Sequence, residues 1–246
     1  HRAGEASWAA THRVRTNADC TVEEQAKILF LGPEHVTVET NDYGYCKEAA
    51  GPNVRAGLKT LSLPMVASPP GGDDAGLKFA EVFPESAGQF AKGVPAALAR
   101  VEHEGIRGCL EQHPTAESWG LVRRSGEWVL RTRLADGATP CRGLFQDADV
   151  PVAVPASITG AAGKTALSVR RLFPGARDWM ASPEGTLLGV VMPRSIALYV
   201  VRDGAVIRPA ALTIPIATGE SVVSVQWTAS SESAQRVAEL QTMAVR

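Results

Sequence analysis

The sequence has almost no net charge and no long hydrophobic run, and these two absences exclude several classes of protein. Its 25 Lys and Arg residues nearly balance 26 Asp and Glu residues, which leaves a formal net charge of -1. Nucleic-acid-binding domains and polybasic membrane-binding segments carry a marked excess of positive charge. We therefore predict no nucleic-acid partner. Because no run of about 18 apolar residues occurs, we also predict no transmembrane segment.

The sequence also lacks the local motifs of common catalytic and nucleotide-binding sites. Gly163-Lys164-Thr165 follows an apolar segment as in a phosphate-binding loop, but Ile158 stands where that motif has its first glycine. No Gly-x-Ser-x-Gly nucleophile elbow is present. His103-Glu104 is followed by Gly105 and does not complete a zinc-binding H-E-x-x-H motif. We predict no cofactor and no metal, and the sequence identifies no catalytic residue.

An enzyme whose site is assembled from distant residues is the alternative interpretation, with a hydrolase-like reaction. The densest local group of ionisable side chains is His103 and His113 with Glu102 or Glu104. Two histidines and a carboxylate are a usual set of zinc ligands. A solvated helix end explains the same residues without chemistry, and we favour that interpretation.

Two further groups of residues have a binding interpretation and a simpler one. Asp147 and Asp149 are expected in a loop, where they could help to hold Ca²⁺, but the rest of a calcium loop is missing. Three of the five Trp residues, Trp119, Trp128 and Trp179, lie in or beside predicted strands. Packing in the core explains them better than a sugar-stacking platform does.

The four cysteines, Cys20, Cys46, Cys109 and Cys141, include no C-x-x-C pair. An even number without metal-like spacing suggests two disulfides, for which three connectivities exist. We favour Cys20 with Cys46 and Cys109 with Cys141, because each bond closes a loop within one half of the chain. The alternative is four buried free thiols in a cytosolic protein. Disulfides predict a periplasmic or extracellular protein, and the start at His1 is consistent with removal of a signal peptide or with a lipoprotein anchor.

Composition and length are those of an ordinary globular protein. Hydrophobic residues make up 45% and charged residues 21% of the 246 residues, enough for one large domain or two modest ones. Basic residues are mostly Arg, and Ala, Gly and Val are abundant, as in proteins from GC-rich bacterial genomes.

The first half of the chain predicts strands around a central helical segment. Residues 27–44 give a strand, a break at Gly32-Pro33 and a second strand. Thr21 and Glu24 have the spacing of a helix-capping box, a competing signal for a brief helix. Residues 58–66 predict an edge strand. Residues 77–112 show helical periodicity, and a second helix is expected to begin at Pro95 and to end near Gly105 or Gly108.

The second half predicts hairpins and a closing helix. Residues 119–134 predict two strands divided by Ser125-Gly126. Residues 150–160 predict either an edge strand or a segment that crosses between the halves, because Pro151 and Pro155 remove ladder donors. Residues 165–173 predict a short helix. Residues 179–207 predict a three-strand meander, residues 221–228 a further strand, and residues 234–241 a C-terminal helix.

These elements predict an α+β fold: a mainly antiparallel sheet with a central helical segment, a strand meander in the C-terminal third and a C-terminal helix. The expected organisation is a lead-in segment or edge strand over residues 1–19, an α+β domain over 20–149 and a sheet-rich half over 150–246. The two halves are either two domains or one shared core. The turn at residues 182–185 resembles a turn in blades of TolB-like propellers, but no repeat of about 40 residues accompanies it.

Residues 27–160 resemble the extracytoplasmic domain of bacterial lysozyme-sensing anti-sigma factors and related envelope proteins. The resemblance rests on the order of "FLGPEHVTVETNDYG", "LKTLSLP", "LKFAEVF", a Trp-bearing hairpin and "VPVAVP". It implies an α+β fold that acts by binding. The chain lacks the family's "GGAH"-like signature, so no site residue is carried over. We therefore expect an extracytoplasmic bacterial protein, a non-enzymatic binding or structural module for a protein or an envelope component.

Overall fold

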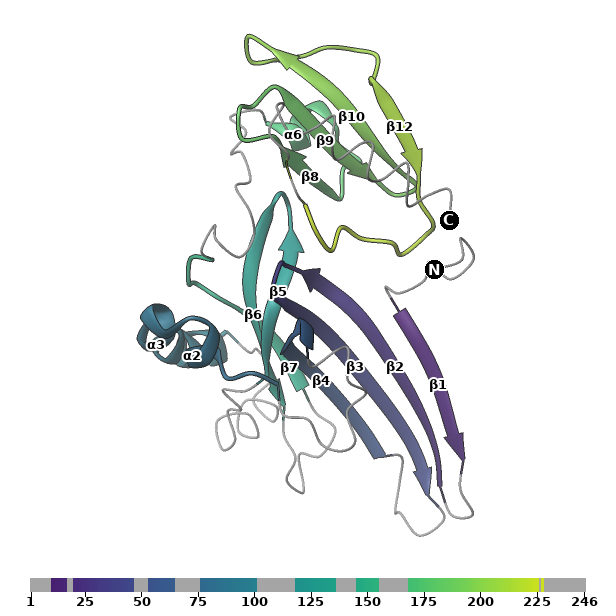
Figure 1. Cartoon of the computed structure of the whole chain (residues 1–246), viewed down its shortest axis with the longest axis vertical. Helices are drawn as coiled ribbons and strands as arrows, with labels where there is room; N and C mark the ends of the chain where they lie inside the picture. Colours follow the sequence, from purple (N-terminus) through teal and green to yellow (C-terminus); the bar gives the residue numbers. More distant parts are fainter. Residues whose placement is uncertain are drawn as a thin grey trace. The chain divides into compact units, whose positions relative to one another are not determined.

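The computed structural model describes residues 10–16, 20–46, 53–64, 76–100, 118–135, 145–154, 168–225 and 227. These residues group into two compact units, each with its own sheets (Figure 1). The N-terminal unit holds the described residues from 10 to 154, except for the turn 124–127. The C-terminal unit holds that turn and the described residues from 168 onward. The N-terminal unit ends at Val154.

Four antiparallel strands form the first sheet of the N-terminal unit. In spatial order they are β1 (Ala10–Thr16), β2 (Cys20–Leu31), β3 (His35–Cys46) and β4 (Asn53–Ser62). The predicted strand, turn and strand about Gly32-Pro33 are confirmed as β2 and β3, and the predicted edge strand is β4. The brief helix suggested by Thr21 and Glu24 is wrong, because both residues pair across strands inside β2.

The ladder between β2 and β3 contains a register shift. Phe30 pairs with Thr37, and the next pair is Ile28 with Val38, so the register skips Leu29. An extra residue on one strand is a β-bulge, and it moves every later pair by one position. The ladder then runs without interruption to its far end.

The predicted central helical segment is present as α2 (Phe79–Val82), a 3₁₀ turn (Pro84–Ser86) and α3 (Ala87–Leu98). The prediction that a helix begins at Pro95 is wrong, because Pro95 lies inside α3. The helix continues through this position because it is held against β7, where a Cβ on Gly93 would lie 2.6 Å from the Val150 side chain. Within the described residues, no helix is long and apolar enough to cross a membrane.

An aromatic cluster forms the core of the N-terminal unit around the helices. The Phe79 and Phe90 rings stack at 4.2 Å between centroids, and the Trp119 ring meets Phe79 edge-on at 5.1 Å. Trp119 is fully buried, and its indole Nε1 donates to the Leu77 carbonyl oxygen at 2.8 Å. Trp119 therefore packs in the core, as predicted, with its polar atom satisfied.

A second sheet of the N-terminal unit contains β5 (Trp119–Arg124), β6 (Glu127–Ala135) and β7 (Phe145–Val150) in that order. Ser125 and Gly126 have φ angles of 51° and 88°. Two successive positive φ values define the tight turns that suit the twist of a hairpin. The hairpin predicted around Ser125-Gly126 is confirmed.

The C-terminal unit is built on the predicted meander. After the short helix α6 (Val169–Leu172), the strands are β8 (Asp178–Ala181), β9 (Leu187–Met192), β10 (Ser195–Arg202), β11 (Ala205–Val206) and β12 (Leu212–Pro215). Both β11 and β12 pair with β10, at successive positions along it. The strand predicted over 221–228 does not form over 221–225. The predicted C-terminal helix lies outside the described residues.

One face of this sheet is covered by α6 and the turn after it. Val169 and Phe173 form a buried cluster with Leu188 and Val190 of β9, and Tyr199 packs against it. Since strand side chains alternate between the two faces, Leu187 and Leu198 belong to the opposite face. The α+β class with antiparallel sheets and a C-terminal meander is thus what the structure shows.

Candidate functional site

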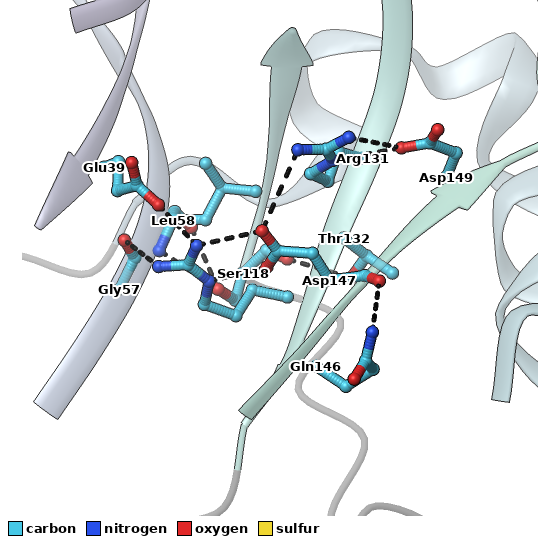
Figure 2. Close-up of polar contacts among 10 residues, drawn as sticks. Glu39, Gly57, Leu58, Ser118, Arg131, Thr132, Gln146, Asp147 and Asp149 are labelled. Atoms are coloured by element: carbon cyan, nitrogen blue, oxygen red, sulfur yellow. Dashed lines mark hydrogen bonds and ion pairs between the residues drawn. The ribbon is translucent and has the colours of Figure 1, made fainter. Parts of the chain in front are cut away.

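The most extensive charged cluster in the described residues surrounds Arg133 of β6 in the N-terminal unit (Figure 2). The Arg133 side chain is 2% exposed. Its guanidinium donates to both carboxylate oxygens of Asp147, at 2.7 and 3.0 Å, and to Glu39 Oε1. It also donates to the Gly57 carbonyl oxygen at 3.3 Å. This one side chain therefore joins β6 and β7 to β3 and β4, and so links the two sheets of the unit.

A second arginine extends the cluster along the same pair of strands. Arg131 donates from Nε to Asp149 Oδ1 at 3.0 Å and lies 3.8 Å from Asp147 Oδ2. Arg131 stands opposite Asp149, and Arg133 stands opposite Asp147, in the β6–β7 ladder. We call these four residues and Glu39 the charged ladder.

The charged ladder is internally paired. Burial lowers the pKa of Arg133, but the hydrogen bonds and charges of Asp147 and Glu39 outweigh it, so the pKa is raised overall and the guanidinium stays charged. Four hydrogen bonds engage its Nε, Nη1 and Nη2 atoms. A buried arginine held in this way fixes the arrangement of its neighbours. The geometry favours a structural role over acid–base chemistry.

Hydroxyl groups complete the junction between the two sheets. Thr37 and Thr60 lie 3.2 Å apart between their Oγ1 atoms. Thr37 Oγ1 accepts from the Leu121 amide at 3.0 Å, and Thr60 Oγ1 donates to the Trp119 carbonyl oxygen at 3.1 Å. Both threonines are buried. The backbone of β5 is thus bonded to side chains of β3 and β4 rather than to another strand at these atoms.

The close approach of β5 to Thr37 of β3 requires a glycine at position 120. A Cβ on Gly120 would lie 2.2 Å from Thr37 Cγ2, far closer than two non-bonded carbon atoms can approach. Beside it, Ser118 Oγ donates to the Leu58 carbonyl oxygen at 3.0 Å and accepts from the Leu58 amide at 3.3 Å. This junction is held by hydroxyl and backbone groups that bond to one another.

The C-terminal unit presents the opposite chemistry on the sheet face away from α6. Register places Leu198 opposite Leu212, Ile196 opposite Ile214, and Val200 opposite Leu187. Directly opposed residues share a face of the sheet. The exposed fractions are 40% for Leu187, 50% for Leu212 and 43% for Ile214. We call these six residues the aliphatic face.

The structure describes some of the predicted site residues and not others. Cys20 and Cys46 stand directly opposite each other at the end of the β2–β3 ladder. Cys109, Cys141, His103 and His113, with the neighbouring glutamates, lie outside the described residues. Among the residues that are described, no group of three or more His, Cys, Asp or Glu could hold a metal ion.

The prediction that Asp147 and Asp149 lie in a solvated loop is wrong, because both are in β7 and pair with arginines. No local sequence motif marks Arg131 and Arg133 as members of a site. A signal was present in the matching spacing of Arg131-Thr132-Arg133 and Asp147-Ala148-Asp149, since residues two positions apart lie on the same face of a strand. The spacing becomes informative only once β6 is known to pair with β7, because that pairing sets each arginine opposite an aspartate.

Comparisons with known protein families, with curated proteins and with solved structures find no match to this chain.

Proposed function

We propose that this chain is a non-enzymatic, extracytoplasmic bacterial binding module, whose partner is a protein that docks on the aliphatic face of the C-terminal sheet. The observation that carries the proposal is the exposure of Leu187, Leu212 and Ile214 on one face of that sheet. Grouped exposed aliphatic side chains mark interaction sites more often than scattered ones do.

The chemistry of this face selects among partner classes. It consists of aliphatic side chains and carries no aromatic ring on which a sugar could stack. The chain as a whole has a formal net charge of -1, which gives no attraction for nucleic acid. A protein surface with its own apolar face fits these properties best.

The charged ladder supports the non-enzymatic part of the proposal. A catalytic acid, base or nucleophile needs access to substrate, whereas Arg133 is 2% exposed and bonded to Asp147, Glu39 and Gly57. The resemblance of residues 27–160 to envelope proteins that act by binding is a second support. It also motivates the proposed periplasmic or extracellular location.

Three immobilised proteins test the docking surface: the wild type, the double variant Leu212→Asp with Ile214→Asp, and Thr213→Asp. Thr213 lies between the two aliphatic residues on the same exposed strand but belongs to the other face. A partner purified from a bacterial envelope extract should bind the wild type and Thr213→Asp with similar Kd. Charge on the aliphatic face should weaken binding by about 10- to 100-fold. Equal Kd values for all three proteins would contradict the proposal.

The location has a separate test. Cells that express the natural gene are fractionated into cytoplasm, periplasm, membranes and medium, and the protein is detected by antibody. We expect the protein outside the cytoplasm. Recovery with a cytoplasmic marker enzyme would overturn the location and leave the docking surface to be judged by its own binding data.

A further inference from the structure

We propose that Cys20 and Cys46 form a disulfide that closes the open end of the β2–β3 ribbon. The two residues are the last pair of an antiparallel ladder that begins next to the turn at Gly32-Pro33. The proposal rests on the backbone register of two described strands and does not depend on the proposed function.

The register alone brings the two cysteines within bonding distance. Directly opposed residues of an antiparallel pair have Cα atoms about 4.5 to 5.5 Å apart. Disulfides span Cα separations of about 4.4 to 6.8 Å. Cys20 and Cys46 are directly opposed, so their place in the ladder corresponds to a Cα separation that a disulfide can span.

The bulge at Leu29 is what produces this pairing. On the turn side of the bulge, Leu31 pairs with Val36 and Phe30 with Thr37. If that register continued along the strand, Cys20 would stand opposite residue 47. The skipped residue shifts the ladder by one position and sets Cys20 opposite Cys46. A shift of one residue also exchanges the faces of a strand, so the bulge decides whether the two thiols share a face.

The position of the bond in the sheet would keep β2 and β3 together at one end. The β1–β2 ladder ends nearby with Thr16 opposite Thr21, and the β3–β4 ladder ends with Gly44 opposite Asn53. Both of these connections between strands therefore lie at the same end of the sheet as the cysteines. A bond there closes residues 20–46 into a ring and prevents β2 and β3 from separating at that end.

The oxidation is a thiol–disulfide exchange. The thiolate of one cysteine attacks a disulfide-bearing oxidant, such as oxidised glutathione, and releases one thiol of that oxidant. The second cysteine then attacks the mixed disulfide and releases the other thiol. The protein loses two electrons and two protons, and the oxidant is reduced to two thiols.

Mass mapping of the whole chain tests the proposal. The native protein is incubated in a glutathione buffer with an excess of the oxidised form, alkylated with N-ethylmaleimide under denaturing conditions, and digested without reduction. We expect a linked pair of peptides that contain Cys20 and Cys46. Alkylation of both residues, or linkage of Cys20 to Cys109 or Cys141, would overturn the proposal.

A matched variant tests whether the register selects the bond. In Tyr45→Cys with Cys46→Ser, the second thiol moves by one position, to the residue opposite Thr21. Successive positions alternate between faces, so the yield of the Cys20 link should fall at least tenfold in the same buffer. Circular dichroism checks that the variant is folded. A yield equal to that of the wild type would overturn the role of the register, whereas binding to the aliphatic face is measured separately and is unaffected by either outcome.

Discussion

The two units of this protein differ in the side chains on their sheets: the N-terminal unit has a polar junction, and the C-terminal unit has an exposed apolar face. In the N-terminal unit, the junction between the sheets is built from a buried arginine, carboxylates and hydroxyl groups that are bonded to one another. In the C-terminal unit, one sheet face packs against α6 through apolar side chains, and the other exposes Leu187, Leu212 and Ile214. Polar groups with fixed geometry define one arrangement of neighbours, whereas an exposed apolar face has surface left to bury.

The largest effect is expected from Arg133→Met. Removal of a buried cation leaves Glu39 and Asp147 facing each other without their shared partner, and breaking a buried ion pair costs about 3 to 5 kcal/mol. Arg131→Met is the matched control on the same strand, because the Arg131 side chain is 20% exposed, so that water screens its ion pair more strongly and its loss should cost about 1 kcal/mol. Urea unfolding measures both free energies, and equal losses would contradict the contrast between them.

The pH dependence of the Arg133 contribution follows from the direction of its pKa shift. The folded-state pKa of the guanidinium is raised, so the stabilisation is present below the pKa of an unfolded arginine and is lost only as pH rises through the folded-state pKa. The difference in unfolding free energy between wild type and Arg133→Met should therefore stay constant from about pH 7 to about pH 10. A decline within that range would show that another group titrates.

Two adjacent leucines lie on opposite faces of the C-terminal sheet and allow the faces to be compared. Leu188 is 1% exposed and packs under α6, whereas Leu187 is 40% exposed on the aliphatic face. Leu188→Ala should destabilise the protein by about 2 to 5 kcal/mol through lost contacts and a cavity. Leu187→Ala should change the free energy of unfolding by less than about 1 kcal/mol. Similar losses would mean that the aliphatic face is covered.

A smaller loss is expected from Gly120→Ala at the junction of the N-terminal sheets. The added methyl group collides with Thr37 Cγ2, and overpacking of this kind costs about 1 to 3 kcal/mol. In a Thr37→Ser background that methyl group is gone, while the hydroxyl that accepts from the Leu121 amide remains. A double-mutant cycle should show that the second change recovers part of the loss, and strict additivity would argue against the close approach.

The smallest effect on stability is expected from the docking variant. Leu212→Asp with Ile214→Asp places charge where the side chains are already half exposed, so thermal unfolding should shift little, by about 0.5 kcal/mol or less per residue. Partner binding should fall sharply in the same protein. A large loss of stability would instead assign these residues to the core.

Local signals predicted the turns better than the packing. Ser125-Gly126 and Gly32-Pro33 mark hairpin turns in the sequence, and the structure has both. Pro95 was misleading because its usual place is the first turn of a helix, while here contact with β7 keeps α3 continuous. That contact is between segments distant in sequence and has no local signature.

The charged ladder also depends on contacts between segments that are distant in the sequence. In the sequence, nothing distinguishes four of its members from ordinary charged surface residues: Arg131, Arg133, Asp147 and Asp149. They form one network, with Arg133 buried at its centre, only when β6 pairs with β7 and Glu39 is brought in from β3, 94 residues before Arg133. In the aliphatic face, the alternation of Ile196, Leu198 and Val200 is visible in the sequence, but Leu212 and Ile214 join them only through the pairing of β12 with β10.

The turn 124–127 has a consequence for anyone who cuts this chain into fragments. It groups with the C-terminal unit, where the Gly126 amide donates to Asp178 Oδ1 at 2.6 Å and a Cβ at Gly126 would lie 2.2 Å from Trp179 Nε1. A gene fragment that starts after residue 154 therefore encodes the meander without the glycine that caps Asp178. Expression of that half alone should give a less soluble product than a version to which residues 124–127 are appended through a linker.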